Sequence, residues 1–115
     1  MSIQRYHVGP RLSEIVVHNN TVYLAGQVAD NLDLDCRGQT VEVLGMIDRL
    51  LAEVGSDKSK ILQVTIFLAD MTDYDAMNEA WSDWVSEGNT PARATVQAQL
   101  ALPGYKVEIL LTAGL

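Results

Sequence analysis

The strongest constraint on the fold is a short apolar run that lies between two segments of helical periodicity. Residues Ile61–Leu68 are rich in β-branched side chains and too few for a typical helix, so they predict a largely buried strand. Before this run, apolar residues recur at steps of three and four between Gly38 and Val54, which predicts an amphipathic helix. After it, Asp73 is a suitable N-cap for a second helix that Gly88 would end. The apolar faces contain these residues: Val41, Leu44, Ile47, Leu51 and Val54 in the first helix, and Met77, Trp81, Trp84 and Val85 in the second.

Strand-like segments flank this central unit on both sides. Near the N-terminus, Glu14–Val17 and Thr21–Ala25 are rich in β-branched and aromatic residues and are separated by a polar turn, which predicts a β-hairpin. Near the C-terminus, Ala92–Ala101 and Tyr105–Ala113 alternate between apolar and polar residues, and Pro103-Gly104 would let them pair as a second hairpin. The order is therefore β-β-α-β-α-β-β, which favours an α+β fold with one mixed sheet and both helices on one face.

The length and charge of the chain limit its organisation and its partners. No Pro-, Gly- or Ser-rich linker divides the 115 residues, so one domain over residues 1–115 is expected. The formal net charge of -7, from 15 acidic and 8 basic side chains, repels phosphate backbones, so nucleic acid is not an expected partner. No run approaches the roughly 18 apolar residues that cross a bilayer, and no signal-peptide core is present, so we expect no membrane partner and a cytoplasmic location.

The sequence offers no motif for metal binding or covalent catalysis. The single Cys36 is expected in a polar loop before the first helix, and the two histidines, His7 and His18, are expected on the surface. These residues do not have metal-ligand spacing, so no metal site is predicted. Nucleophile-elbow, phosphate-loop and zincin motifs are also absent from the sequence.

Arg93 and Glu108 are the leading candidate site residues, because each is a charged residue within a strand-like pattern near a turn, on the face that the alternation predicts to be polar. A guanidinium presents a fixed fork of donors that matches a carboxylate. The structural alternative is a salt bridge within the chain. In the predicted hairpin, Arg93 would lie opposite a residue near Thr112, which leaves Glu108 about 13 Å away at about 3.3 Å per residue. A shared site would more naturally combine two chains.

Two further features suggest contact with a ligand or with another subunit. Gly26 ends the predicted second strand, where the missing side chain either lets a ligand approach a backbone N–H or simply ends the strand. The polar face of the last two strands also carries Leu110 and the small Thr95 and Thr112, which suits a partly enclosed subunit interface. Oligomerisation is therefore a hypothesis that the residues themselves suggest.

Three C-terminal segments resemble the signature of the RidA/YjgF family, namely Pro91–Val96, Leu102-Pro103 and Lys106–Ile109. Ala25-Gly26-Gln27 also resembles the family's Ser-Gly-Gln, and Met77-Asn78 with the aromatic residues that follow resembles its second helix, so the similarity spans nearly the whole chain. It implies a chorismate-mutase-like fold and a homotrimer with clefts between neighbouring subunits. It further implies hydrolytic deamination of reactive 2-imino acids or enamines to 2-oxo acids and ammonia, without a metal or an organic cofactor.

The resemblance also implies roles for individual residues. Arg93 would bind the substrate carboxylate, and the backbone N–H of Gly26 would assist binding. Glu108 would orient or activate the attacking water. Thr95 would line the pocket at a position where the family often has Cys or Ser.

The chain departs from the archetypal pattern at its N-terminal side. Arg11 stands where the archetypal branch has a Tyr after Gly-Pro, and Ala25 lacks the hydroxyl of the usual Ser. Arg11 would either add a second cation that favours dicarboxylate substrates or pair with Glu14 on the surface. The substrate preference is therefore open.

Two other functions compete with the deaminase reading. A trimer without turnover would use Arg93 to hold a 2-oxo acid or another small carboxylate in a regulatory role. A ribonuclease or translation inhibitor, an activity attached to relatives of the family, has little physical support, because the chain is acidic and lacks an acid/base histidine pair. Replacement of Glu108 by Gln would separate the first two functions, because hydrolysis needs the base and binding does not.

Overall fold

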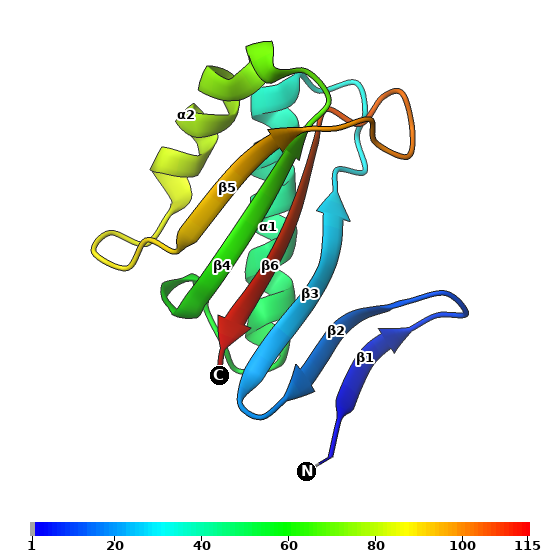
Figure 1. Ribbon diagram of the computed structural model, residues 1–115, viewed down its shortest axis with the longest axis vertical. Helices are drawn as coiled ribbons and strands as arrows, with labels where there is room; N and C mark the ends of the chain where they lie inside the picture. The colour runs from blue at the N-terminus through cyan, green and yellow to red at the C-terminus, as the bar shows by residue number, and fades with distance from the viewer. Residues whose placement is uncertain (1) are drawn as a thin grey trace.

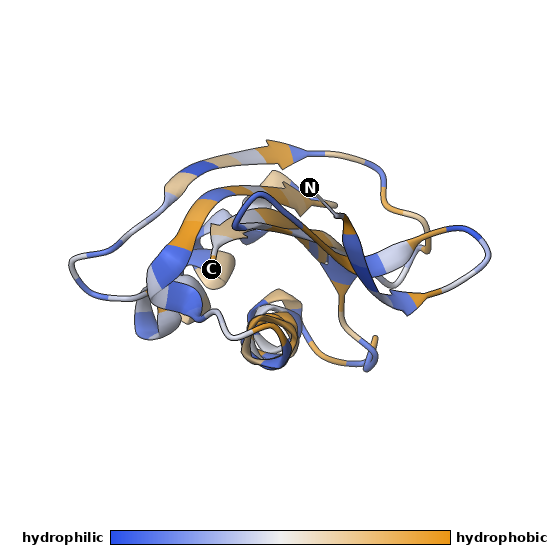
Figure 2. Ribbon diagram, turned by 90° about the horizontal axis from the view of Figure 1, so that it is seen from below, coloured by the Kyte–Doolittle hydropathy of each residue, from blue (hydrophilic) through white to orange (hydrophobic). Residues whose placement is uncertain are grey.

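The computed structural model describes residues 2–115, which form one six-stranded sheet with two helices packed against it. The strand order is β1-β2-β3-β6-β4-β5, and only β4 and β5 run parallel. Both helices lie on the same side of the sheet (Figures 1 and 2). The prediction of a mixed sheet with both helices on one face is therefore confirmed. The elements are β1 Gln4–Val8, β2 Ser13–His18, β3 Thr21–Val28, α1 Cys36–Glu53, the short 3-10 helix η1 Lys58–Lys60, β4 Ile61–Leu68, the 3-10 helix η2 Met71–Asp73, α2 Tyr74–Trp84, β5 Ala92–Gln97 and β6 Val107–Gly114.

The edge strand β1 was missed by the sequence pattern. It pairs antiparallel with β2, and four of its five residues are exposed, so it carries no alternation of buried and exposed side chains that could reveal it. His7 lies in this strand with a positive φ of 53°, between the paired residues Tyr6 and Val8. The observed order therefore begins with three strands instead of two.

The predicted C-terminal hairpin is wrong. β5 pairs with β4 in parallel at the edge of the sheet, whereas β6 lies between β3 and β4. Every second residue of β6 is fully or almost fully buried. Burial of these apolar side chains stabilises the fold most when the strand lies in the middle of the sheet, where helices cover one of its faces. The long segment from Ala98 to Lys106 carries the chain across the end of β4, so the turn at Pro103-Gly104 does not join neighbouring strands.

Helix α1 packs its apolar face on the centre of the sheet. It begins at Cys36, because the Asp35 side chain accepts a hydrogen bond from the Gly38 N–H at 2.8 Å and caps the helix earlier than predicted. Val41 is 51% exposed, so its predicted place in the core is wrong, and Val43 is buried instead. Gln39 is also buried. Its side-chain amide is satisfied by the loop before β6, because its N–H donates to the Gly104 carbonyl and its oxygen accepts from the Lys106 N–H. These bonds fix the start of β6 against α1.

Helix α2 covers β4 and β5 and ends earlier than its sequence suggests. Asp70 caps the preceding 3-10 turn, whereas Asp73 makes no side-chain capping bond. The helix stops at Trp84 rather than near Gly88, and Lys58 Nζ donates a 2.6 Å hydrogen bond to the Trp84 carbonyl there. Trp81 is buried and Trp84 packs partly buried against the core, as predicted.

The face of the sheet opposite the helices is open within one chain. Tyr23, Val96 and Leu110 from three different strands are more than two-fifths exposed on it, and together they form what we call the open-face patch. A shallow groove of about 330 Å³ runs beside Tyr23 and Leu110. Large apolar side chains that gather on one sheet face are typical of a surface that contacts another protein.

Candidate functional site

Arg93 lies on the helix-covered side of the sheet and not on the open face with Glu108, so the predicted common face is wrong. The register explains the difference, because Arg93 pairs with the buried Val64 of β4, whereas Ala92 and Ala94 point to the open side. Small alanines fit either face of a sheet, so the alternation of residues in this edge strand predicted the wrong face for Arg93. β5 consequently directs its cationic side chain toward α2, which lies beside it in Figure 1.

Four side chains of α2 lie against the Arg93 guanidinium, and one of them is Met77, whose Sδ is 4.0 Å from Nη1. Nη1 donates a 2.8 Å hydrogen bond to Asn78 Oδ1, and Nη2 donates a longer one of 3.4 Å to the Tyr74 hydroxyl. The guanidinium carbon lies 5.2 Å from the centre of the Trp81 ring and 6.0 Å from that of Tyr74. All of these partners are neutral, so the charge of Arg93 is stabilised by dipoles and aromatic faces alone.

Arg93 has no acidic partner among residues 2–115. The ion pairs of this part of the chain involve His7 and Arg37 instead. The alternative of an intrachain salt bridge to Glu108 is therefore wrong. A guanidinium with an uncompensated charge and N–H groups left over from the Asn78 and Tyr74 bonds can still bind an anion.

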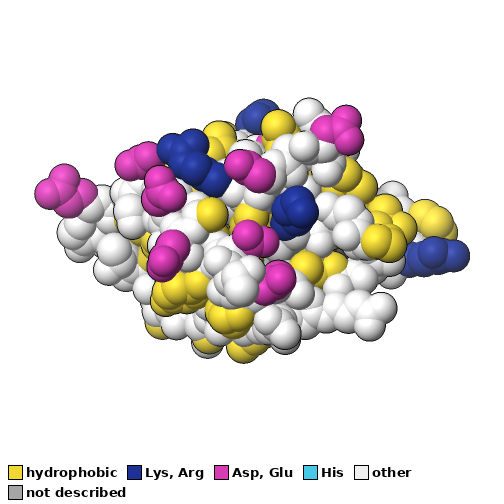
Figure 3. Space-filling view, turned by 90° about the horizontal axis from the view of Figure 1, so that it is seen from above, with side chains coloured by type: hydrophobic (Ala, Val, Ile, Leu, Met, Phe, Trp, Pro, Cys, Tyr) yellow, Lys and Arg dark blue, Asp and Glu magenta, His cyan; other side chains and the backbone are white. Residues whose placement is uncertain are grey.

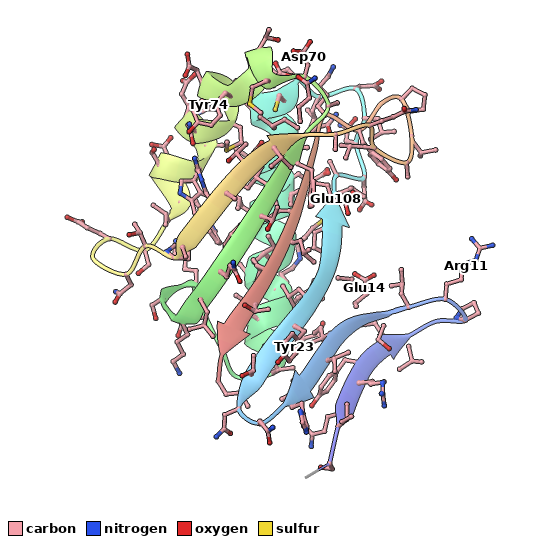
Figure 4. All side chains as sticks on the ribbon, viewed as in Figure 1. Arg11, Glu14, Tyr23, Asp70, Tyr74 and Glu108 are labelled. Carbon is pink, nitrogen blue, oxygen red and sulfur yellow. The ribbon has the colours of Figure 1, made fainter. Side chains whose placement is uncertain are left out.

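Glu108 and Gly26 meet at a distortion of the sheet. The register of β3 against β6 shifts between Leu24 and Gln27, and Gly26 lies within this bulge. A methyl group added at Gly26 would collide with the Glu108 carboxylate, whose carbon would be 3.0 Å away. The sequence predicted both residues as site candidates, and the structure brings them together near the start of β6. Figure 4 labels Glu108 at this place in the sheet.

Arg93 and Glu108 lie far apart within one chain. Glu108 pairs with Phe67 of β4, which in turn pairs with Val96 of β5, two strands away from Glu108. Arg93 lies three residues before Val96 along β5. Strand dimensions place the two Cα atoms about 14 Å apart, and the side chains leave opposite faces of the sheet. The expectation that one chain does not join them directly is supported by this geometry.

Thr95 follows Arg93 on the same side of β5. Its Oγ1 is buried but has no hydrogen-bond partner among the described residues. A buried hydroxyl without a partner costs free energy, so a hydrogen bond to this atom from a ligand or a neighbouring chain would be stabilising. Arg93 and Thr95 together offer two kinds of donor at the edge of the sheet.

Arg11 lies at the exposed tip of the β1–β2 hairpin and points away from the sheet (Figure 4). It does not pair with Glu14 on the surface, so that alternative is wrong. Glu14 instead accepts a 2.8 Å hydrogen bond from the side chain of Gln27, next to Gly26. Glu14 and Gln27 help to line a groove of about 510 Å³ between α1 and the first three strands, which includes Gly26.

Several residues of the site escaped the sequence reasoning. Tyr74 and Asn78 were not singled out as partners of Arg93, although their spacing of four residues on a helix places both on one face. Glu14 and Gln27 could not be connected without the register of β2 and β3. Only tertiary contacts show which of the many polar side chains meet the candidates.

Cys36 is the first residue of α1 and is buried, so the predicted polar loop is wrong at this position. Burial, aided by the Asp73 carboxylate, raises the pKa of its thiol from 9.0 to about 11. The neutral thiol is the favoured form, so this contribution to stability is complete below about pH 9 and is lost as the pH rises through about 11.

We expect iodoacetamide to label Cys36 of the folded protein at pH 8 about a hundredfold more slowly than in the denatured chain, because thiolate is the reactive form and burial suppresses it. Mass spectrometry of timed samples measures both rates. Equal rates in the folded and denatured protein would contradict the buried position.

Residues 2–115 contain neither a metal-binding cluster nor a membrane-spanning helix. No group of three or more His, Cys, Asp or Glu side chains is arranged to hold a metal ion. None of the helices in this part of the chain has the length and apolar character needed to span a membrane.

Replacement of Gly26 by Ala should displace the Glu108 carboxylate while the fold persists, because the obstructing atoms are the far end of a flexible side chain. We expect a melting temperature within a few degrees of the wild type and a rate of imino-acid hydrolysis at least about tenfold lower. Gly45→Ala is the matched control, since its new methyl group would meet only Arg49 Nη1 at 3.6 Å. Equal activity of the two variants would show that the position of Glu108 is unimportant.

The fold and these contacts define a small α+β protein with a half-covered mixed sheet and an unneutralised arginine at its edge. The family model described as Endoribonuclease L-PSP matches residues 3–115, so the chain belongs to this family. This membership confirms the resemblance to the RidA/YjgF family.

Relatives and solved structures agree with this membership. A "RutC family protein" of Haemophilus influenzae is 53% identical, and the match covers 98% of each chain. The crystal structure of a YjgF family member from Neisseria meningitidis superposes with a TM-score of 0.97 at 47% identity, over 99% of this chain and 95% of that one. A mouse protein named "2-iminobutanoate/2-iminopropanoate deaminase" is 32% identical over 89% of this chain and 78% of its own.

Proposed function

We propose that this protein hydrolyses reactive 2-imino acids, or the enamines in equilibrium with them, to 2-oxo acids and ammonia. The observation that carries the proposal is the Arg93 guanidinium, which neutral side chains of α2 hold in place and no carboxylate of the described chain neutralises. Such a group suits the carboxylate that every 2-imino acid carries. Kinship with the mouse deaminase supports the same substrate class.

The reaction needs orientation and a base more than a nucleophilic side chain. The C2 atom of an imine is electrophilic, and a water oxygen attacks it while one water proton passes to Glu108. The new C–O bond gives a carbinolamine. Glu108 returns this proton to the nitrogen, then takes the remaining proton of the carbinolamine hydroxyl and passes it to the nitrogen as well. The C=O bond forms as the C–N bond breaks, and ammonia and the 2-oxo acid leave. One imine and one water give one 2-oxo acid and one ammonia, and no atom is oxidised or reduced.

We propose that the site forms between two chains of a homotrimer. Arg93 and Glu108 leave opposite faces of the sheet in one chain, which suits a cleft to which neighbouring chains contribute one residue each. The open-face patch supplies apolar surface for the contact between chains. In this arrangement Arg93 and Thr95 bind the substrate, and Gly26 and Glu108 of the adjacent chain approach its C2 atom. Arg11 would reach such a cleft from the hairpin tip.

The proposal includes neither nucleic acid nor membrane as a partner, requires no metal or organic cofactor, and places the reaction in the cytoplasm. Figure 3 shows acidic side chains spread over the end of the molecule where α2 begins, among few basic ones. The net charge of -7 disfavours phosphate backbones. A small anion would therefore depend on the local charge of Arg93 for its binding.

A second function is favoured by one specific observation. The arginine with its neutral partners is complete within a single chain, whereas Glu108 is joined to it only through the proposed assembly. A trimer that binds 2-oxo acids or other small carboxylates without turnover would need the arginine alone. Hydrolysis is the test that separates this regulatory binder from the deaminase.

The experiment couples an amino-acid oxidase to semicarbazide, which traps the imino acid before it hydrolyses. We expect the protein to lower the amount of trapped product in proportion to its concentration. Neutral and acidic amino acids are compared, because a second cation at Arg11 would favour the acidic ones. No effect with either class would contradict the deaminase function and leave carboxylate binding, measured with 2-oxobutanoate by calorimetry, as the function.

A further inference from the structure

We infer that Trp81, together with Tyr74, is a positioning residue that holds the Arg93 guanidinium in the orientation required to bind a carboxylate. This inference rests on the proposed function in one respect, since it assumes that Arg93 binds the ligand. From the sequence, Trp81 was expected in the core, and Tyr74 was not expected to have a role.

The contacts of the Arg93 guanidinium come from a single helix. Tyr74, Asn78 and Trp81 occupy positions i, i+4 and i+7 of α2, which lie along one face of a helix. The guanidinium carbon is 5.2 Å from the Trp81 ring centre and 6.0 Å from the Tyr74 ring centre, within the range of cation–π attraction. The position of Arg93 is therefore set by a single rigid element.

The Trp81 ring is held rigidly by its neighbours. Trp81 is 7% exposed, and its ring lies 5.5 Å from that of Trp84. The indole N–H of Trp84 is in turn fixed by a 2.9 Å hydrogen bond to Asp48 of α1. An aromatic ring supported in this way cannot move aside, so it restricts the rotamers of the Arg93 side chain that lies against it.

The side chains that surround the Arg93 guanidinium are uncharged. A carboxylate could also orient Arg93, but it would neutralise the guanidinium and compete with an anionic ligand. Aromatic rings and the Asn78 amide orient the group without cancelling its charge. These neighbours thus restrict the orientation of the guanidinium and leave some of its N–H donors available for a ligand.

The test measures carboxylate binding rather than turnover, with 2-oxobutanoate as the probe. Trp81→Leu and Tyr74→Leu should each weaken binding about three- to thirtyfold, the range that corresponds to the loss of one cation–π contact. Trp81→Phe and Tyr74→Phe, which keep an aromatic face, should recover most of the affinity. Tyr6→Leu is the matched control, because Tyr6 lies in β1 at the opposite edge of the sheet and its ring is not among the contacts of Arg93, and it should bind as the wild type does.

A spectroscopic readout separates positioning from a general loss of stability. The chain contains two tryptophans, so Trp84→Phe leaves Trp81 as the single indole. Its fluorescence should change saturably on addition of 2-oxobutanoate, and Arg93→Ala in the same background should abolish the change. If Trp81→Leu fails to fold, Tyr74→Leu decides the question, because Tyr74 is 40% exposed and its loss leaves the core intact.

The outcomes distinguish this inference from the proposed function. If Arg93→Ala binds 2-oxobutanoate normally, the proposed role of the arginine itself is wrong. If Arg93→Ala loses binding whereas Tyr74→Leu and any folded Trp81→Leu keep wild-type affinity, the positioning role is overturned and the arginine site stands. If the Leu variants bind 2-oxobutanoate more weakly and the Phe variants restore the affinity, both the arginine site and the positioning role are supported.

Discussion

Arg93→Ala should lower kcat/KM for imino-acid hydrolysis by about a hundredfold or more, because a charge-assisted pair with the substrate carboxylate contributes about 3 kcal/mol at a shielded site. Arg93→Lys keeps the charge but loses the planar fork that binds a carboxylate through two bonds, so it should recover only a small part of the activity. The semicarbazide competition assay measures all three proteins.

Stability provides the control for this substitution. Arg93 is half-buried on an edge strand, and its removal leaves Asn78 Oδ1 without a partner at a site that water can reach. We therefore expect thermal unfolding of Arg93→Ala to remain within a few degrees of the wild type. Full activity in a folded Arg93→Ala protein would exclude the proposed substrate clamp.

Glu108→Gln should abolish hydrolysis almost completely while it largely spares carboxylate binding. The amide keeps the size of the side chain beside Gly26 but cannot accept a proton from water, and general-base catalysis contributes about a hundred- to ten-thousandfold. Single-turnover hydrolysis and 2-oxobutanoate calorimetry provide the two readouts. If binding and hydrolysis fell together, Glu108 would be a binding residue instead of the base.

A mixture of the two inactive variants tests whether the site is shared between chains. In a cleft built from two neighbours, an Arg93→Ala chain supplies Glu108 and a Glu108→Gln chain supplies Arg93. Three quarters of randomly mixed trimers contain both chains and have one complete site of three, so co-refolded equal amounts should regain about a quarter of the wild-type activity. No recovery from mixed trimers, verified by mass spectrometry with distinguishable tags, would contradict the shared cleft.

The accuracy of the sequence predictions followed the strength of the local signals. Ile61–Leu68 was predicted with the same bounds that the structure shows, because its apolar and β-branched residues leave few alternatives. β1 was missed because an exposed edge strand does not need an alternating pattern. The final hairpin was wrong because Pro103-Gly104 signals a turn but not which strands lie on either side of it.

In the candidate site, too, local sequence context identified single residues but not their relative positions. Arg93, Glu108 and Gly26 could be named from the sequence because they are charged or side-chain-free residues in unusual contexts. Their relative positions could not, because the phase of the edge strand β5 depends on its pairing with Val64. Tyr74 and Asn78 became relevant only when α2 was placed against Arg93.

The sequence by itself determined the class of fold, the main helices and strands, and the residues whose chemistry is unusual for their surroundings, since these depend on contacts over a few residues. The tertiary structure decided the strand order, the opposite directions of Arg93 and Glu108, and the meeting of Gly26 with Glu108. These features arise from pairing between segments far apart in the chain. Such pairing is selected by burial of the whole sheet against both helices, and no local pattern encodes it.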